Sequence, residues 1–168
     1  MEYKRQIIIF FLLLIYMSGC KEQMESSETS VESLSNTEDN SIAKIKENLS
    51  AEGYEIFDYI DEKTKDTVLM QQYFIAFLKR GPNRSQSKVE ADSLQSLHLA
   101  HLGRMYEEGF ADISGPFGDD GEIRGITIYN TPTLEMADSL ANIDPMVKAG
   151  RLVIEIHPWW AAKGFPLR

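Results

Sequence analysis

Two histidines and one aspartate are the residues of this chain whose types and spacing point to chemistry. His98 and His101 lie three positions apart, and side chains at that spacing share one face of a helix. Asp144 stands before Pro145 in a second short segment. A carboxylate that binds one ring nitrogen of a histidine fixes the tautomer, and the other nitrogen can then move a substrate proton near neutral pH. These residues therefore predict an acid–base pair, His98 and Asp144.

Each of these residues also has a plainer interpretation. A buried histidine held by a carboxylate needs no turnover, and Asp before Pro is a common turn or cap residue. We predict that His101 faces the same site and contacts the substrate. A metal site would need a third ligand such as Glu155 or His157, and the sequence lacks the clear ligand spacing of zinc motifs. We therefore predict neither a metal nor a cofactor.

The segments around these residues predict one small α+β domain at residues 42–168. Strand, helix, strand, strand, helix, strand is the ferredoxin-like βαββαβ order, with helices on one face of an antiparallel sheet. The predicted strands are 54–60, 67–79, 113–117, 126–129 and 152–157, and Pro158 is expected to end the last one. The predicted helices are 42–49, Ser87 to Gly109, and one that starts at 131 with Pro132 in its first turn. A broken helical segment follows at 142–149.

The strand at 67–79 is apolar at both parities, so both faces of the sheet should be covered. A symmetric dimer, packed sheet against sheet, would supply the cover that the chain itself lacks. The strand at 54–60 is an added hairpin strand. On a helical wheel the inward arc of the long helix consists of Leu94, Leu97, His98, His101, Leu102 and Met105.

Residues 1–19 have the layout of a secretory signal peptide. Lys4 and Arg5 precede an apolar run from Ile7 to Tyr16, which is too short to span a bilayer as a helix. Ser18 and Gly19 before Cys20 resemble a bacterial lipobox, and that resemblance implies cleavage before Cys20 and lipid attachment to it. A cysteine with several acyl chains would anchor the protein to a membrane without a spanning helix.

Residues 20–41 read as the lipidated cysteine and a disordered acidic tether, because they are rich in Ser and Glu and nearly free of large apolar residues. Lys21 is not the Asp that retains some lipoproteins at the inner membrane, so an outer-membrane location in the cell envelope is favoured. The net charge of −9 argues against a nucleic-acid partner, which requires clustered Lys and Arg.

Between residues 70 and 160 the chain resembles the YCII-related family of small dimeric α+β-barrel proteins. The matching pieces, in order, are Tyr73-Phe74, His98-Leu99-Ala100, Gly115-Pro116, Asp144-Pro145 and Ala149-Gly150. The resemblance implies a homodimer and maps the family's histidine to His98. Members are proposed to use a His–Asp pair in acid–base chemistry, and at least one related activity eliminates a halide from an aromatic ring.

Three further residues complete the predicted site. Ser114 and Gly115 follow the long helix in the matching region, and Gly115 is interpreted as letting the strand pass close to the pocket. Arg124 is a candidate contact for an anionic substrate, or else a solvated surface residue. Trp159 and Trp160 are interpreted as packing or interface residues.

The sequence thus supports two hypotheses of different classes. The first is a membrane-tethered, cofactor-free isomerase or lyase that acts on a small molecule through His98 and Asp144. The alternative is a non-catalytic lipoprotein that binds a small ligand or assists assembly, in which the histidine is structural.

Overall fold

The computed structural model describes residues 41–165 and 167. The predicted leader, Cys20 and the tether as far as residue 40 lie outside the described residues. Residues 42–168 form one compact unit. Within the described residues, no helix combines the length and the apolar character that crossing a membrane requires.

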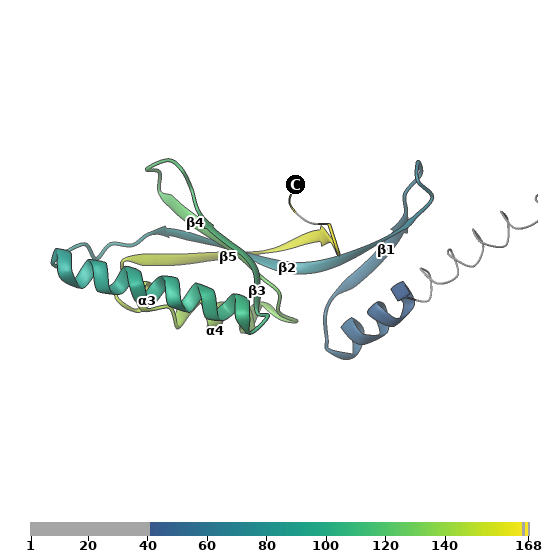
Figure 1. Cartoon of the computed structure of the whole chain (residues 1–168), viewed down its shortest axis with the longest axis horizontal. Coiled ribbons are helices and arrows are strands. Elements are labelled where there is room, and N and C mark those ends of the chain that lie inside the picture. Colours follow the sequence, from purple (N-terminus) through teal and green to yellow (C-terminus); the bar gives the residue numbers. More distant parts are fainter. Residues whose placement is uncertain (1–40, 166, 168) are drawn as a thin grey trace, which may run out of the picture. The chain divides into compact units, whose positions relative to one another are not determined.

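Among the described residues, five antiparallel strands form one sheet (Figure 1). The strands are β1 (Ile56–Ile60), β2 (Thr67–Arg80), β3 (Ala111–Pro116), β4 (Ile123–Tyr129) and β5 (Leu152–Ala162). The long strand β2 pairs with β5 along one edge, and with β1 and then β4 along the other edge. Strand β3 pairs with the outer side of β4.

Without β1, the spatial order of the strands is β5-β2-β4-β3. One helical connection joins β2 to β3 and a second joins β4 to β5. This is the ferredoxin-like split βαβ arrangement, so the predicted α+β fold class is confirmed. Strand β1 is the added hairpin strand, and a helix at residues 41–51 precedes it, linked to it by an ion pair between Lys46 and Asp58.

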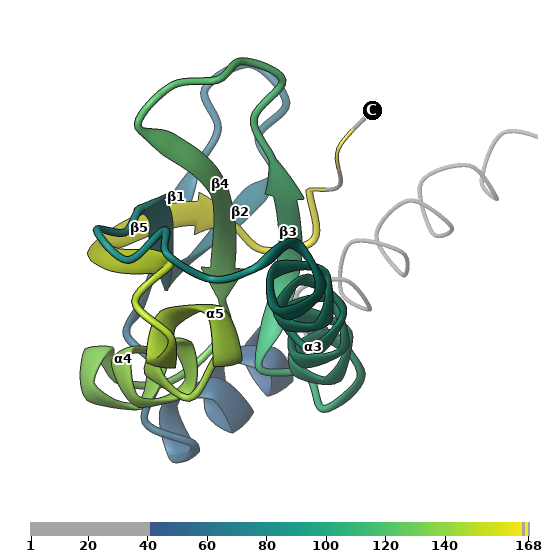
Figure 2. The ribbon, with the colours of Figure 1, turned by 90° about the vertical axis from the view of Figure 1, so that its left-hand side faces the viewer.

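The helices α3 (Lys88–Glu107), α4 (Leu134–Asn142) and α5 (Pro145–Lys148) lie on one side of the sheet formed by β2–β5 (Figure 2). Helix α3 begins with the predicted capping box of Ser87 and Glu90, which satisfies two backbone donors. Gly109 has a φ of 77° just past its end, a conformation that glycine adopts at little cost.

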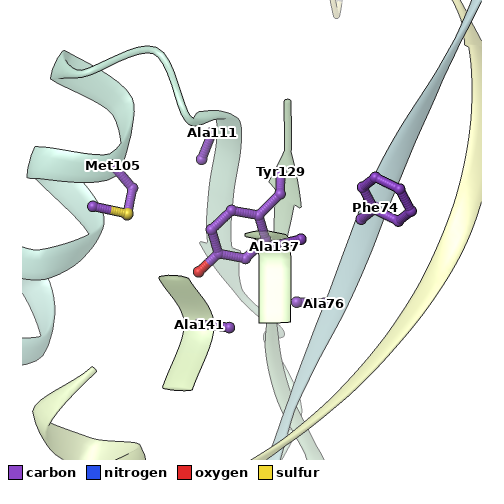
Figure 3. Packing of buried hydrophobic residues seen from close by; sticks show 7 residues of the cluster. All are labelled: Phe74, Ala76, Met105, Ala111, Tyr129, Ala137 and Ala141. Atoms are coloured by element: carbon purple, nitrogen blue, oxygen red, sulfur yellow. The ribbon is translucent and has the colours of Figure 1, made fainter. Parts of the chain in front are cut away.

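The core lies between this face of the sheet and the helices. Its main cluster consists of Phe74, Ala76, Met105, Ala111, Tyr129, Ala137 and Ala141. Figure 3 shows the ring of Tyr129 among Met105 of α3 and the alanines of α4. The alanines leave room for that ring, as close packing of a core requires.

The opposite face of the sheet combines apolar residues with the ion-paired Lys79, Glu155 and His157, and the helices α3–α5 do not cover it. Along each strand, residues that point to this face alternate with residues that point to the core. We call this face the open face. Its apolar members are Tyr73, Ile75, Phe77, Ile113, Ile126, Ile128, Val153 and Trp159. Val153 and Trp159 are each 41% exposed.

Three local expectations were wrong. Pro158 does not end the last strand, which continues to Ala162; β5 pairs only with β2 among the described strands, and an edge strand tolerates a proline. Pro132 lies before the cap of α4 rather than in its first turn, because Thr133 is the N-cap. Leu97 is 51% exposed, since one residue turns a helix by about 100° and carries it away from His98.

Candidate functional site

Helix α3 turns both of its histidines toward the interior. His98 and His101 are buried together with Met105, and positions separated by three or four residues lie on one face of a helix. The sequence therefore predicted this inward face correctly at its central positions. The partners of the two histidines differ.

His98 is bonded to Asp144, as predicted. Its Nδ1 lies 2.6 Å from Oδ2 of Asp144, and the two side chains are 10% and 3% exposed. A buried polar group needs such a partner. The pair joins the middle of α3 to the residue that begins α5, although the two residues are far apart in the sequence.

Asp144 is held in place by its second oxygen. Its Oδ1 accepts the backbone N–H of Met146 at 2.7 Å, so Asp144 is the N-cap of α5 with Pro145 in the first turn. One oxygen therefore caps a helix while the other faces the imidazole. The plainer interpretation of Asp before Pro, a helix cap, is thus correct for the same side chain that meets the histidine.

The carboxylate also selects the tautomer of His98. Asp144 accepts the hydrogen of Nδ1, which leaves Nε2 of the neutral ring with a lone pair. Among the described residues, Nε2 of His98 has no protein partner and is not one of the buried, unpaired polar atoms. Solvent therefore reaches this nitrogen.

His101 has the opposite surroundings. Its Nδ1 accepts a hydrogen bond from Nη2 of Arg104 at 3.1 Å, and its Nε2 is buried. Burial is the main cause that lowers the pKa of His101, and the charges of Arg104 and His98 lower it further. Asp144 and the backbone carbonyl of Leu140 oppose this shift. His101 is thus a neutral histidine held inside the domain, and not a solvent-facing substrate contact.

Polar residues of the sheet lie beneath the helices. Tyr129 is 2% exposed, and burial together with the Asp144 charge raises its pKa, so its hydroxyl stays protonated. Thr127 is buried, and its hydroxyl lies 3.0 Å from that of Ser114 on β3. Ser114 therefore lies on the same face as Thr127, although Ser114 itself is exposed.

The structure places the other predicted site residues elsewhere. An added Cβ at Gly115 would meet no atom within 4 Å, while one at Gly125 would lie 2.6 Å from the carbonyl oxygen of Gly115, so the close backbone approach requires glycine at Gly125. Arg124 binds Oδ1 of Asp120 at 2.7 Å in the β3–β4 turn. No described contact joins Arg124 to His98.

The residues considered as further metal ligands lie on the other side of the sheet. Glu155 and His157 pair with Phe77 and Ile75 on the open face and are bonded to each other. Within the described part of the chain, no group of three His, Cys, Asp or Glu side chains is placed to hold a metal ion.

Sequence reasoning missed Tyr129, Thr127 and Arg104. The signal for Arg104 was its spacing of three residues from His101, which puts a cation beside that ring. Tyr129 and Thr127 alternate with Ile128 along a strand that is apolar at most positions, so their common face was visible from the sequence. Their proximity to α3 and α5 required the fold.

No family model and no curated protein match the chain. One solved structure similar to it is 5-chloro-2-hydroxyhydroquinone dehydrochlorinase from Burkholderia phenoliruptrix, in complex with 2,5-dihydroxybenzoquinone. The two chains share 20% sequence identity, and the similarity covers 52% of this chain and 92% of the other, with a TM-score of 0.40.

Proposed function

We propose that the domain is a YCII-like, cofactor-free acid–base enzyme, of the isomerase or lyase type, that acts on a small molecule. The observation that carries this proposal is the 2.6 Å contact between His98 Nδ1 and Asp144 Oδ2. Asp144 is fixed in turn by the N–H of Met146. A histidine oriented in this way by a fixed carboxylate is one arrangement that supports acid–base catalysis.

The proposed chemistry runs through Nε2 of His98. The lone pair on Nε2 takes a proton from a substrate carbon or oxygen, and the carboxylate of Asp144 stabilises the positive charge that forms on the ring. In an isomerisation the ring returns the proton to another atom of the same substrate. In an elimination the electron pair expels the leaving group, and the proton passes to that group or to solvent. Tyr129 does not compete as a base, because its raised pKa keeps it protonated.

A mixed library of small metabolites, incubated with the purified full chain and followed by NMR, tests this proposal. Turnover should appear for at least one compound, and H98N should slow it by about a hundredfold or more, as loss of a general base does. The matched control is L99N, the next residue of α3, whose side chain is 57% exposed. L99N should retain the wild-type rate.

The alternative function is a non-catalytic lipoprotein that binds a small ligand or assists assembly. It is favoured by the capping role of Asp144, which gives the pair a structural purpose without turnover. This alternative expects no turnover by any compound and a large loss of stability in H98N. Turnover that H98N abolishes, with the variant still folded, excludes it.

We also propose that two copies of the chain pack through the open face. Burial of the apolar residues of this face would be favourable at about 25 cal/mol per Å², and a twofold axis would place the same patch on both partners. F77D should convert the dimer into a monomer in analytical ultracentrifugation. V89D, on the exposed side of α3 where Val89 is 80% exposed, should not. A wild-type monomer at all concentrations would contradict this proposal.

The tethering proposal concerns Cys20. The lipobox-like sequence before it supports lipid attachment and a place in the cell envelope, with the outer membrane favoured. Wild-type protein should incorporate labelled palmitate in a bacterial host and fractionate with membranes. C20A should lose both properties, and an unchanged label would overturn the proposal.

A further inference from the structure

Four arginines gather at one end of the sheet, and none of them takes part in the proposed proton transfer. We call them the arginine cluster: Arg80 at the end of β2, Arg84 in the β2–α3 connection, Arg124 in β4 and Arg151 just before β5. Because β2 runs antiparallel to β4 and β5, the end of β2 meets the beginnings of both neighbours. This end of the sheet faces the viewer in Figure 2.

Arg80 and Arg124 share one carboxylate oxygen. Nη2 of Arg80 lies 3.0 Å from Oδ1 of Asp120, and Nη1 of Arg124 lies 2.7 Å from the same atom. A single negative charge therefore faces two guanidinium groups. Asp120 itself is 88% exposed, so this carboxylate does not seal the two arginines from solvent.

The β2–α3 connection is tied to the segment before β5. Gly81 donates its N–H to the carbonyl of Arg151 at 2.9 Å, and Asn83 donates its N–H to the carbonyl of Gly150 at 3.0 Å. The approach is so close that a Cβ on Gly81 would collide with the carbonyl oxygen of Gly150. These contacts hold Arg84, the next residue of the connection, beside Arg151.

Two donors of the cluster are left without a protein acceptor. Arg151 binds Oε1 of Gln86 at 2.8 Å through Nη1, but its Nε is buried and unpaired. Within the described residues, the guanidinium of Arg84 has neither a hydrogen bond nor an ion pair. Burial and then the charges of Arg151, Arg80 and Arg124 lower the pKa of Arg84, and Glu122 opposes them.

The charge at this end of the sheet is therefore unbalanced. Four guanidinium groups lie at this end, where Asp120 pairs with Arg80 and Arg124 and Asp119 and Glu122 belong to the same turn, in a protein whose net charge is −9. A local excess of positive charge draws anions. Guanidinium groups bind phosphate oxygens through paired, charge-assisted hydrogen bonds.

We propose that the arginine cluster binds the dianionic phosphate group of a small molecule, with Arg84 as its free donor. The local excess of positive charge attracts a dianion, and its several oxygens can meet donors that come from different strands. This site is independent of the His98–Asp144 pair.

Titration calorimetry of the purified full chain with inorganic phosphate, at constant ionic strength, tests the proposal. Saturable binding is expected, and R84Q should weaken it about tenfold, as loss of a hydrogen bond between charged groups does. Because the guanidinium of Arg84 makes no hydrogen bond or ion pair within the described residues, R84Q should unfold at the same denaturant concentration as wild type. R84K keeps the charge but loses the planar guanidinium, so its affinity for phosphate should lie between those of wild type and R84Q.

The matched control is K88Q. Lys88 lies close to Arg84 in the chain, but its side chain is 87% exposed and is paired with Asp92, so K88Q should change the affinity less than about twofold. If R84Q and K88Q lose the same affinity for phosphate, the binding comes from general positive potential alone, and the proposal is overturned. Absence of saturable binding would overturn it as well, and so would binding only to vesicles that contain phosphatidic acid. H98N should bind phosphate with unchanged affinity, which separates this test from that of the proposed enzyme.

Discussion

Two histidines on one helix face, three residues apart, have opposite surroundings. His98 meets a carboxylate at 2.6 Å and presents its second nitrogen to solvent. His101 meets a guanidinium at 3.1 Å and buries its second nitrogen. The charge of the partner and the access of water, rather than the residue type, separate a candidate base from a structural side chain.

The same comparison identifies Asp144 as the residue on which the site depends. It is bonded to His98 and its charge also raises the pKa of His101, against the larger effect of burial. One side chain thus caps a helix, orients one imidazole and influences a second. Substitutions of Asp144 and of the two histidines can separate these effects.

The largest effect is expected from D144N. Asparagine is as good an N-cap as aspartate, so the free energy of unfolding should change by less than about 1 kcal/mol. The amide cannot stabilise a positively charged ring or enforce the same tautomer, so turnover of a substrate found by the metabolite screen should fall by about a hundredfold, and by no more than in H98N, which removes the base itself. Kinetics and urea unfolding on the same sample measure both quantities. A variant that keeps its rate would remove Asp144 from the proposed chemistry.

Stability should respond most to D144A. This change removes a cap, which costs about 1 kcal/mol, and a buried hydrogen bond to a charged group, which costs about 2 kcal/mol. The control is T133A, which removes the N-cap of α4 but touches no histidine and should cost about 1 kcal/mol. Urea denaturation checks the difference. Equal losses would mean that the bond to His98 adds nothing to stability.

The sequence predicted the order of the elements because their signals are local. The capping residues Ser87 and Glu90 and the glycine at 109 mark the ends of α3 by backbone chemistry alone. The extent of β5 was not predictable in this way, because Pro158 is tolerated only where one edge of a strand is unpaired. That condition depends on the whole sheet and cannot be seen in the residues around Pro158.

The candidate site was predictable only in part. The spacing of His98 and His101 predicted a shared face, and their burial confirmed it. Their partners differ because Asp144 at the start of α5 lies beside His98, whereas the side chain of Arg104 lies beside His101. Both positions depend on packing between elements. Arg124 shows the same limit, since its partner Asp120 belongs to the adjoining β3–β4 turn and the other arginines are brought to it by strand pairing.

The smallest effect concerns the pH dependence of stability through His101. Its pKa is lowered in the folded protein, so below about pH 6.5, the unfolded value, the unfolded chain binds more protons. His101 therefore makes its full contribution to the free energy of unfolding above that pH. This contribution declines as the pH falls from about 6.5 through the lowered pKa of the folded protein. Between about pH 7 and about pH 5, H101L should lose less stability than wild type in urea denaturation. R104Q removes one of the charges that lower this pKa, so the stability it loses over this pH range should lie between the losses of wild type and H101L. If all three proteins lose stability in parallel, the buried ring of His101 does not resist protonation, and the contrast with His98 rests on geometry alone.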